Sequence, residues 1–209
     1  MGVTIHYKGQ IDDLARIPAL RDELADVARA MRWNASLLDD DFSAPPDARL
    51  VSGPGGARIA GRLGLKGISI APDRCDLLWF CVDRAGVLRS PLSMVSLPDP
   101  PSLPDDAWIS CKTQFSSPET HAWIVGLLKH LKKRYFSNLD VRDEGGYWDS
   151  GDPAELRRRM DAIGGRIARL AGDLSSSRFS RLAGQSGEDI ADAIEKLVRD
   201  QNDPPPPPP

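Results

Sequence analysis

The chain has 209 residues, of which 41% are apolar and 27% charged, and its formal net charge is −3. This length suits one domain of about 150 residues with an appendage, which can bury a core without disulfides or metals. The small negative charge gives no overall attraction to nucleic acid or to an anionic membrane, so such binding would need a local basic patch.

Cysteine usage and apolar runs predict a protein of the cytoplasm. Residues 1–10 alternate polar and apolar side chains and lack the basic and apolar segments of a secretory signal. No apolar run approaches the roughly 18 residues of a membrane span. Cys75, Cys81 and Cys111 are odd in number and have no C-x-x-C spacing, which predicts free thiols in a reducing compartment.

The first predicted unit is a strand, a helix and a short strand. Apolar residues alternate over 3–8, and an amphipathic helical pattern follows from Ile17 to Trp33, with a short strand at 35–38. Proline and glycine then favour a loop at 43–57.

A meander of strands is predicted next, followed by a second unit. Strand patterns at 67–70, 76–82 and 87–92 indicate antiparallel pairing, and a second proline-rich loop covers 95–107. The second unit comprises, in chain order, a strand at 108–115, a helix that Ser117 caps with Pro118 at its first position, and a strand at 139–144.

These patterns predict the α/β (α+β) class. Two strand-helix-strand units would share one mostly antiparallel sheet of about six strands, with their helices on one face. A further helix begins at Asp152-Pro153-Ala154-Glu155, a variant of the capping box. We expect one domain at 1–172 and then, in order, a linker at 173–187, a short helix at 188–200 and a disordered polyproline tail at 201–209.

Motifs with strong catalytic or nucleotide-binding signals are missing from the sequence. It contains no Walker loop, G-x-G-x-x-G, H-E-x-x-H, G-x-S-x-G or paired C-x-x-C, and we expect neither a metal nor a cofactor. An acid-base role would have to rest on one histidine and nearby carboxylates, namely His121, Glu119, Asp143 and Glu144.

The segment 141–152 is the most unusual in composition. It combines three charges at a strand end, a diglycine and two large amphipathic aromatic residues, which can form either a recognition edge or a salt-bridged turn. The polar face of the preceding strand adds a lysine and a glutamine. The candidate binding residues are Lys112, Gln114, Arg142, Glu144, Tyr147 and Trp148.

A basic stretch at 129–134 closes the second helix. Positive side chains interact favourably with the helix dipole there, so a solvated helix face explains the stretch. Nucleic-acid binding would also need further basic residues and aromatic platforms beside it, and is the weaker interpretation.

Three short motifs resemble a family of small bacterial α/β proteins. They are K-T-Q-F at 112–115, P-E-x-H at 118–121 and R-D-E-G-G-Y-W at 142–148, and the similarity covers mainly residues 108–160. The resemblance implies an α/β fold and implies no activity.

Two functional hypotheses remain open. The first is a non-catalytic regulatory or adaptor protein that binds a protein partner through the aromatic turn, the C-terminal helix or the proline tail. The second is an enzyme or small-ligand-binding protein whose polar site joins Lys112, His121, Arg142 and Glu144. We expect neither a membrane nor nucleic acid to be the partner.

Overall fold

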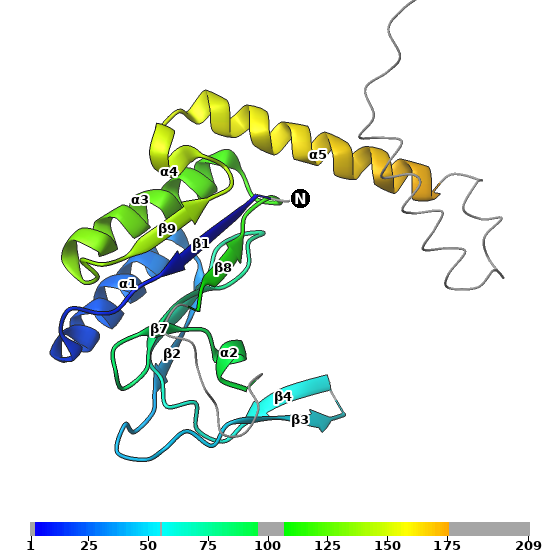
Figure 1. Cartoon of the computed structure of the whole chain (residues 1–209). Helices are drawn as coiled ribbons and strands as arrows, with labels where there is room; N and C mark the ends of the chain where they lie inside the picture. The colour runs from blue at the N-terminus through cyan, green and yellow to red at the C-terminus, as the bar shows by residue number, and fades with distance from the viewer. Residues whose placement is uncertain (1–2, 55, 96–106, 176–209) are drawn as a thin grey trace, which may run out of the picture. The chain divides into compact units, whose positions relative to one another are not determined.

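The computed structural model describes residues 3–54, 56–95 and 107–175, and its mixture of helices and antiparallel sheets confirms the α+β class. The chain divides into two compact units, Met1–Met160 and Asp161–Pro209. Helix α5 (Pro153–Ser175) begins in the first unit and extends into the second. Figure 1 shows the order of the elements along the chain. The predicted tail and terminal helix, and nearly all of the predicted linker, lie outside the described residues.

A three-stranded sheet with the order β8-β1-β9 positions the site (Figure 1). Its strands are β1 (Thr4–Lys8), β8 (Ile109–Lys112) and β9 (Asp140–Asp143), and β1 is antiparallel to both neighbours. Strands β8 and β9 are therefore parallel, and helix α3 (Pro118–Arg134) forms the crossover between them.

Strict alternation gives this sheet one buried and one open face. On β1, Ile5 and Tyr7 are fully buried, whereas His6 and Lys8 between them are partly exposed. The same period continues on β8, where Ile109 and Cys111 are buried and the polar residues between and beyond them are exposed. The open side of the sheet thus carries polar side chains over a rigid apolar layer.

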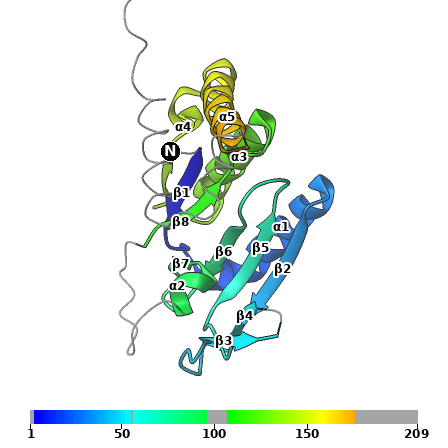
Figure 2. The same ribbon diagram turned by 90° about the vertical axis from the view of Figure 1, so that its right-hand side faces the viewer.

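A second, four-stranded sheet has the order β2-β5-β6-β7. It comprises β2 (Asn34–Asp39), β5 (Lys66–Ala71), β6 (Leu78–Val82) and β7 (Leu88–Arg89), all paired antiparallel, and Figure 2 shows β2, β5 and β6 side by side. The chain beyond β1 joins this sheet to the first, because Leu88 N–H donates to the Gly9 carbonyl at 2.9 Å.

The remaining elements are short apart from helix α1. Helix α1 (Ile17–Met31) follows a 3-10 turn, η1 (Leu14–Arg16). Strands β3 (Arg49–Gly53) and β4 (Gly56–Ala60) form a two-stranded ribbon. Two short helices complete the first unit, α2 (Pro91–Val95) and α4 (Tyr147–Ser150).

Helices α1 and α3 lie side by side. The rings of Trp33, just after α1, and Trp123 on α3 meet edge to face with centroids 5.0 Å apart. Glu23 on α1 accepts a hydrogen bond from the hydroxyl of Tyr135, which directly follows α3, at 2.6 Å. The Ser117 cap of α3 is confirmed, since its hydroxyl accepts from Thr120 N–H at 3.1 Å. Both helices contribute to one apolar core with residues of both larger sheets: Ile5, Tyr7, Leu20, Leu24, Ile68, Ile70, Phe80, Ile109, Ile124, Leu128 and Leu131.

The arrangement of strands differs from the prediction of one sheet of about six. The described residues contain nine strands in three sheets, and β1 and β2 of the first predicted unit belong to different sheets. Half of the predicted loop 43–57 is strand, because β3 pairs with β4 in a ribbon whose side chains are mostly exposed. Exposed strands carry little apolar periodicity, so the sequence pattern of a loop concealed this ribbon.

Candidate functional site

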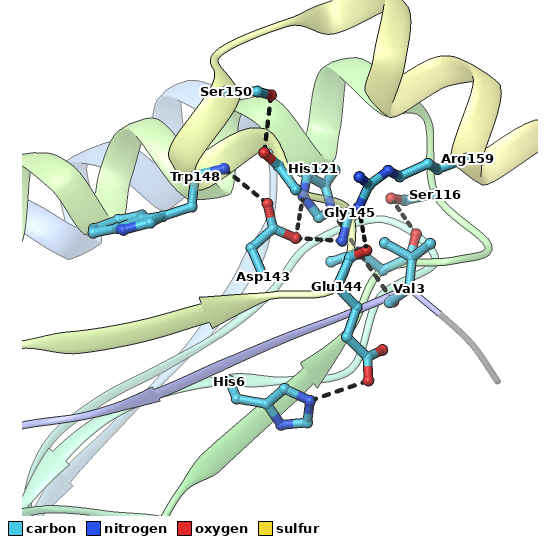
Figure 3. Close-up of polar contacts among 12 residues, drawn as sticks. Val3, His6, Ser116, His121, Asp143, Glu144, Gly145, Trp148, Ser150 and Arg159 are labelled. Carbon is cyan, nitrogen blue, oxygen red and sulfur yellow. Dashed lines mark hydrogen bonds and ion pairs between the residues drawn. The ribbon is translucent and has the colours of Figure 1, made fainter.

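His121 and Asp143 form a buried polar network under the β8-β1-β9 sheet (Figure 3). The His121 side chain lies in the first turns of α3, is fully buried, and places Nε2 at 3.1 Å from Asp143 Oδ1. Its other ring nitrogen, Nδ1, lies 2.8 Å from the hydroxyl of Thr113, which follows β8. The imidazole therefore joins β8, α3 and β9.

Asp143 also organises the turn into α4. Its Oδ1 accepts from Gly145 N–H at 2.7 Å and its Oδ2 accepts from Trp148 N–H at 2.9 Å, as Figure 3 shows. Burial alone would raise the pKa of Asp143, but the neighbouring His121 ring, together with these two backbone N–H groups, holds it below its usual value. Asp143 is thus a charged, fully coordinated carboxylate.

Close packing requires a glycine at position 145, just after β9. A Cβ at Gly145 would lie 2.9 Å from the His121 ring and 2.9 Å from Asp143 Oδ1. The diglycine therefore allows the backbone to approach the ion pair, which explains its place in the sequence in structural terms.

The Thr113 hydroxyl decides how protons are arranged in the network. It lies 3.2 Å from the Val3 carbonyl as well as 2.8 Å from His121 Nδ1, and it has one proton to donate. When that proton goes to the Val3 carbonyl, Nδ1 carries the proton of the hydrogen bond between His121 and Thr113. Among the residues that the structure describes, Nε2 has no hydrogen-bond partner of good angle, so its 3.1 Å contact with Asp143 is chiefly electrostatic. With both side chains buried, the network has no open position for a substrate.

The other carboxylates of the candidate acid-base set do not join this network. Glu119 is exposed and pairs with Arg157 of α5 at 2.5 Å, and its own backbone N–H and the Arg157 guanidinium lower its pKa. Glu144 lies on the open side of the sheet, 3.6 Å from His6 Nε2. Only His121 and Asp143 of that set therefore come together.

Two of the predicted binding residues are half-buried against the core. Tyr147 and Trp148 of α4 pack against the main apolar cluster, and Lys129 lies 5.3 Å above the Trp148 ring. Gln114 is partly buried, and its Oε1 has no hydrogen-bond partner in the part of the chain that the structure describes. The aromatic turn thus contributes much of its area to the protein's own packing.

The remaining three predicted binding residues share the open side of the β8-β1-β9 sheet. The "outer face" comprises His6, Lys8, Trp108, Ser110, Lys112, Asp140, Arg142 and Glu144. Its centre is Trp108, with Arg142 4.3 Å and Lys8 4.8 Å from the ring centroid. The His6 ring hydrogen-bonds Ser110 Oγ at 2.8 Å through Nδ1. The three strands thus bring two cations against one aromatic ring.

A shallow hollow continues the outer face at the end of β1. It encloses about 430 Å³ and is lined by Lys8, Gln10, Val87 and Asn138, among others. Lys8 is shared between the hollow and the Trp108 cluster. An extended ligand could therefore contact both.

The sequence patterns indicate His6 only as a possible imidazole base or ligand, and they give no site role to Lys8, Trp108 or Asp140. Trp108 was assigned only to the start of a strand, and the charged residues of β1 had no apparent partner. The polar positions of β1 were visible in its alternation, but only the pairing of β1 between β8 and β9 brings them beside Trp108 and Arg142.

The basic stretch 129–134 is largely engaged within the first unit. His130 and Arg134 both pair with Glu23 of α1, and Lys132 donates to the Leu139 carbonyl at 2.6 Å. Cations that are occupied in this way have less free charge to offer a phosphate backbone.

Comparison with protein-family models, with curated proteins and with solved structures finds no match to this chain. The motif resemblance therefore brings no activity with it. Within the described ranges, no group of three His, Cys, Asp or Glu side chains is placed to hold a metal ion. In the same part of the chain, no helix combines the length and the apolar character needed to cross a membrane.

Proposed function

We propose that this is a non-catalytic binding protein that recognises another protein through the outer face of the β8-β1-β9 sheet. The observation that carries the proposal is the half-buried Trp108 ring, which both Lys8 and Arg142 contact. Tryptophan and arginine are the residue types most enriched among those that dominate the affinity of protein interfaces.

The sheet provides a preorganised platform for such a contact. Tyr7 and Ile109, beneath the outer face, are at most 3% exposed, so the strands that carry the anchors are fixed by the core. A rigid surface loses little conformational entropy on binding, which favours affinity.

The charges of the outer face favour a protein over a nucleic acid. Asp140 lies opposite Lys8 in the strand register, and Glu144 lies beside His6. These carboxylates would repel a phosphate backbone, whereas a surface of both signs matches the mixed charge of a protein partner.

The buried network argues against the acid-base alternative. His121 and the Asp143 side chain are fully buried, whereas Arg142 is exposed on the opposite face of β9. The residues proposed for a shared polar site thus belong to two separate clusters, one of which is closed to solvent. Among the described residues we find no observation that favours a catalytic function.

Affinity capture with quantitative mass spectrometry tests this proposal. Tagged wild-type protein and the variants Trp108→Ala, Arg142→Glu and Arg58→Glu would be used as baits, and Kd would be measured for any directly bound protein. Arg58 is exposed on β4 and provides the same charge reversal outside the outer face. We expect the two outer-face variants to weaken binding by about 30-fold or more, which corresponds to roughly 2 kcal/mol.

Two results would contradict the proposal. One is a partner whose Kd is the same for wild type and for folded Trp108→Ala and Arg142→Glu, with circular dichroism as the check on folding. The other is salt-dependent binding of a labelled single-stranded oligonucleotide that Arg142→Glu abolishes and Arg58→Glu leaves intact. That result would assign the outer face to nucleic acid.

A further inference from the structure

Two of the three cysteines meet where the β5–β6 turn contacts β8. Cys75 lies in that turn and is half-buried, whereas Cys111 on β8 is fully buried. The Cys75 side chain packs against the apolar cluster that contains Cys111. The two residues are far apart in sequence and adjacent in space.

Three hydrogen bonds hold the turn on β8. Asp76 N–H donates to the Lys112 carbonyl at 3.0 Å, and Lys112 N–H donates to Asp76 Oδ2 at 3.1 Å. The Cys111 thiol lies 3.3 Å from the Asp76 carbonyl oxygen, to which it donates. Because Asp76 directly follows Cys75, these bonds keep Cys75 beside β8, and the Cys75 thiol donates to the Asp73 carbonyl at 3.6 Å.

The environment distinguishes the two thiols. The neighbouring Cys111 thiol lowers the pKa of Cys75, with help from the Ser116 hydroxyl and against the effect of burial. The same pairing, together with burial, raises the pKa of Cys111 far above its usual value. The half-buried Cys75 is therefore the more readily ionised thiol, and a thiolate is the form that reacts with oxidants.

We propose that Cys75 and Cys111 form a reversible disulfide when the protein meets a peroxide, with Cys75 as the attacking thiol and Cys111 as the resolving one. The Cys75 sulfur attacks the O–O bond of hydrogen peroxide, becomes a sulfenic acid, and releases the other oxygen as water. The Cys111 sulfur then displaces the sulfenic hydroxyl, which leaves with the Cys111 proton as a second water. Two thiols are oxidised and one peroxide is reduced, and a thiol reductant reverses the change.

The bond would tie the β5–β6 turn covalently to an edge strand of the β8-β1-β9 sheet. Strand β8 also carries Ser110 and Lys112 of the outer face. This inference rests on the position of the two cysteines and is independent of the proposed binding function.

The test uses the full-length reduced protein treated with hydrogen peroxide. Free thiols are then alkylated under denaturing conditions, and the protein is digested with trypsin without reduction and analysed by mass spectrometry. We expect the number of alkylated cysteines to fall from three to one, and a peptide ending in Lys112 to be linked to the peptide that begins at Cys75. Treatment with dithiothreitol before alkylation should bring the number of alkylated cysteines back to three.

A control variant separates Cys75 from the third cysteine. Cys81 lies in the same tryptic peptide as Cys75, because neither lysine nor arginine occurs between Arg74 and Arg84. Cys81 is fully buried, and burial raises its pKa to about 12, so it should stay reduced. The variant Cys81→Ser should therefore form the same linked peptide as the wild type, whereas Cys75→Ser should not form it.

The proposal is overturned by any of three results. In the first, all three wild-type cysteines remain alkylated after peroxide treatment. In the second, Cys75 reaches the sulfinic acid while Cys111 stays free. In the third, the linked peptide occurs only in a covalent dimer on a non-reducing gel. Fragmentation of the wild-type linked peptide shows whether Cys81 or Cys75 carries the alkyl group, so a variant that failed to fold would not leave the question open.

Discussion

The Asp143 carboxylate should be the most sensitive point in the first unit. In Asp143→Ala, the N–H groups of Gly145 and Trp148 lose a charged acceptor, and the buried His121 ring loses the carboxylate that lies 3.1 Å from its Nε2. Hydrogen bonds to a charged group contribute about 1.5–3 kcal/mol each. Removing one member of a buried ion pair typically costs about 3–5 kcal/mol. The two hydrogen bonds together would contribute about 3–6 kcal/mol, a range that includes the cost of breaking the buried pair. We therefore expect Asp143→Ala to lower the free energy of unfolding by about 3–5 kcal/mol.

Urea unfolding monitored by tryptophan fluorescence measures this loss. With a slope of roughly 2 kcal/mol per molar urea, the midpoint should fall by roughly 1.5–2.5 M. Asp149→Ala is the matched control, because Asp149 lies on α4 next to Trp148 but is exposed. Its midpoint should change little.

The pH dependence supplies a second measurement of the same interaction. The pKa of Asp143 in the folded protein lies below its ordinary value of 3.8, so the unfolded chain binds the proton first as the pH falls. The stabilisation is therefore complete above about pH 5 and disappears as the pH falls through the folded pKa. The stability difference between wild type and Asp143→Asn should shrink over that acidic range.

Coupling between the two side chains completes the test. In a double-mutant cycle with His121→Ala and Asp143→Ala, the double variant should be less destabilised than the sum of the singles, by about 1 kcal/mol or more. The reasoning is refuted if Asp143→Ala lowers the urea midpoint no more than Asp149→Ala does. If the two single losses of stability simply add in the double variant, His121 and Asp143 are not coupled. That result would leave the hydrogen bonds from Gly145 and Trp148 to Asp143 unaffected.

Three further substitutions test the fold, each by thermal unfolding followed by circular dichroism. In Tyr7→Phe, the buried Trp79 N–H loses the phenol oxygen to which it donates at 2.8 Å, so stability should fall by about 1–3 kcal/mol; an unchanged Tm would show that water replaces the phenol. Gly67→Ala should not fold, because its φ is +148° and a Cβ would lie 2.1 Å from the Phe80 carbonyl oxygen, and a cooperative transition near the wild-type Tm would contradict this pairing. In Gly126→Ala, the new Cβ at an exposed helix position would meet no atom within 4 Å among the described residues apart from the adjoining backbone of α3, so stability should rise by about 0.5–1 kcal/mol, and a decrease would show an unrecognised contact.

Local patterns in the sequence predicted the α+β class and the main elements that surround the site. The alternation over 3–8 became β1, and Ser117 with Pro118 marked the start of α3. These predictions succeeded because helix caps and the periods of buried faces are written in neighbouring residues. The ribbon β3–β4 escaped because its exposed strands have no such period.

Both clusters at the site depend on which strands become neighbours. The insertion of β1 between β8 and β9 brings Lys8 to Trp108 and Arg142, from three distant parts of the chain. The crossover from β8 through α3 to β9 places His121 of α3 against Asp143.

The sequence by itself determined which side of β1 is buried and where α1 and α3 begin, because these properties depend on residues a few positions apart. Only the tertiary structure decided that His121 and Asp143 are closed off from solvent while Arg142, next to Asp143, lies on an open face. The pairing of strands far apart in the chain is set by packing of the whole core, for which local periodicity carries no information.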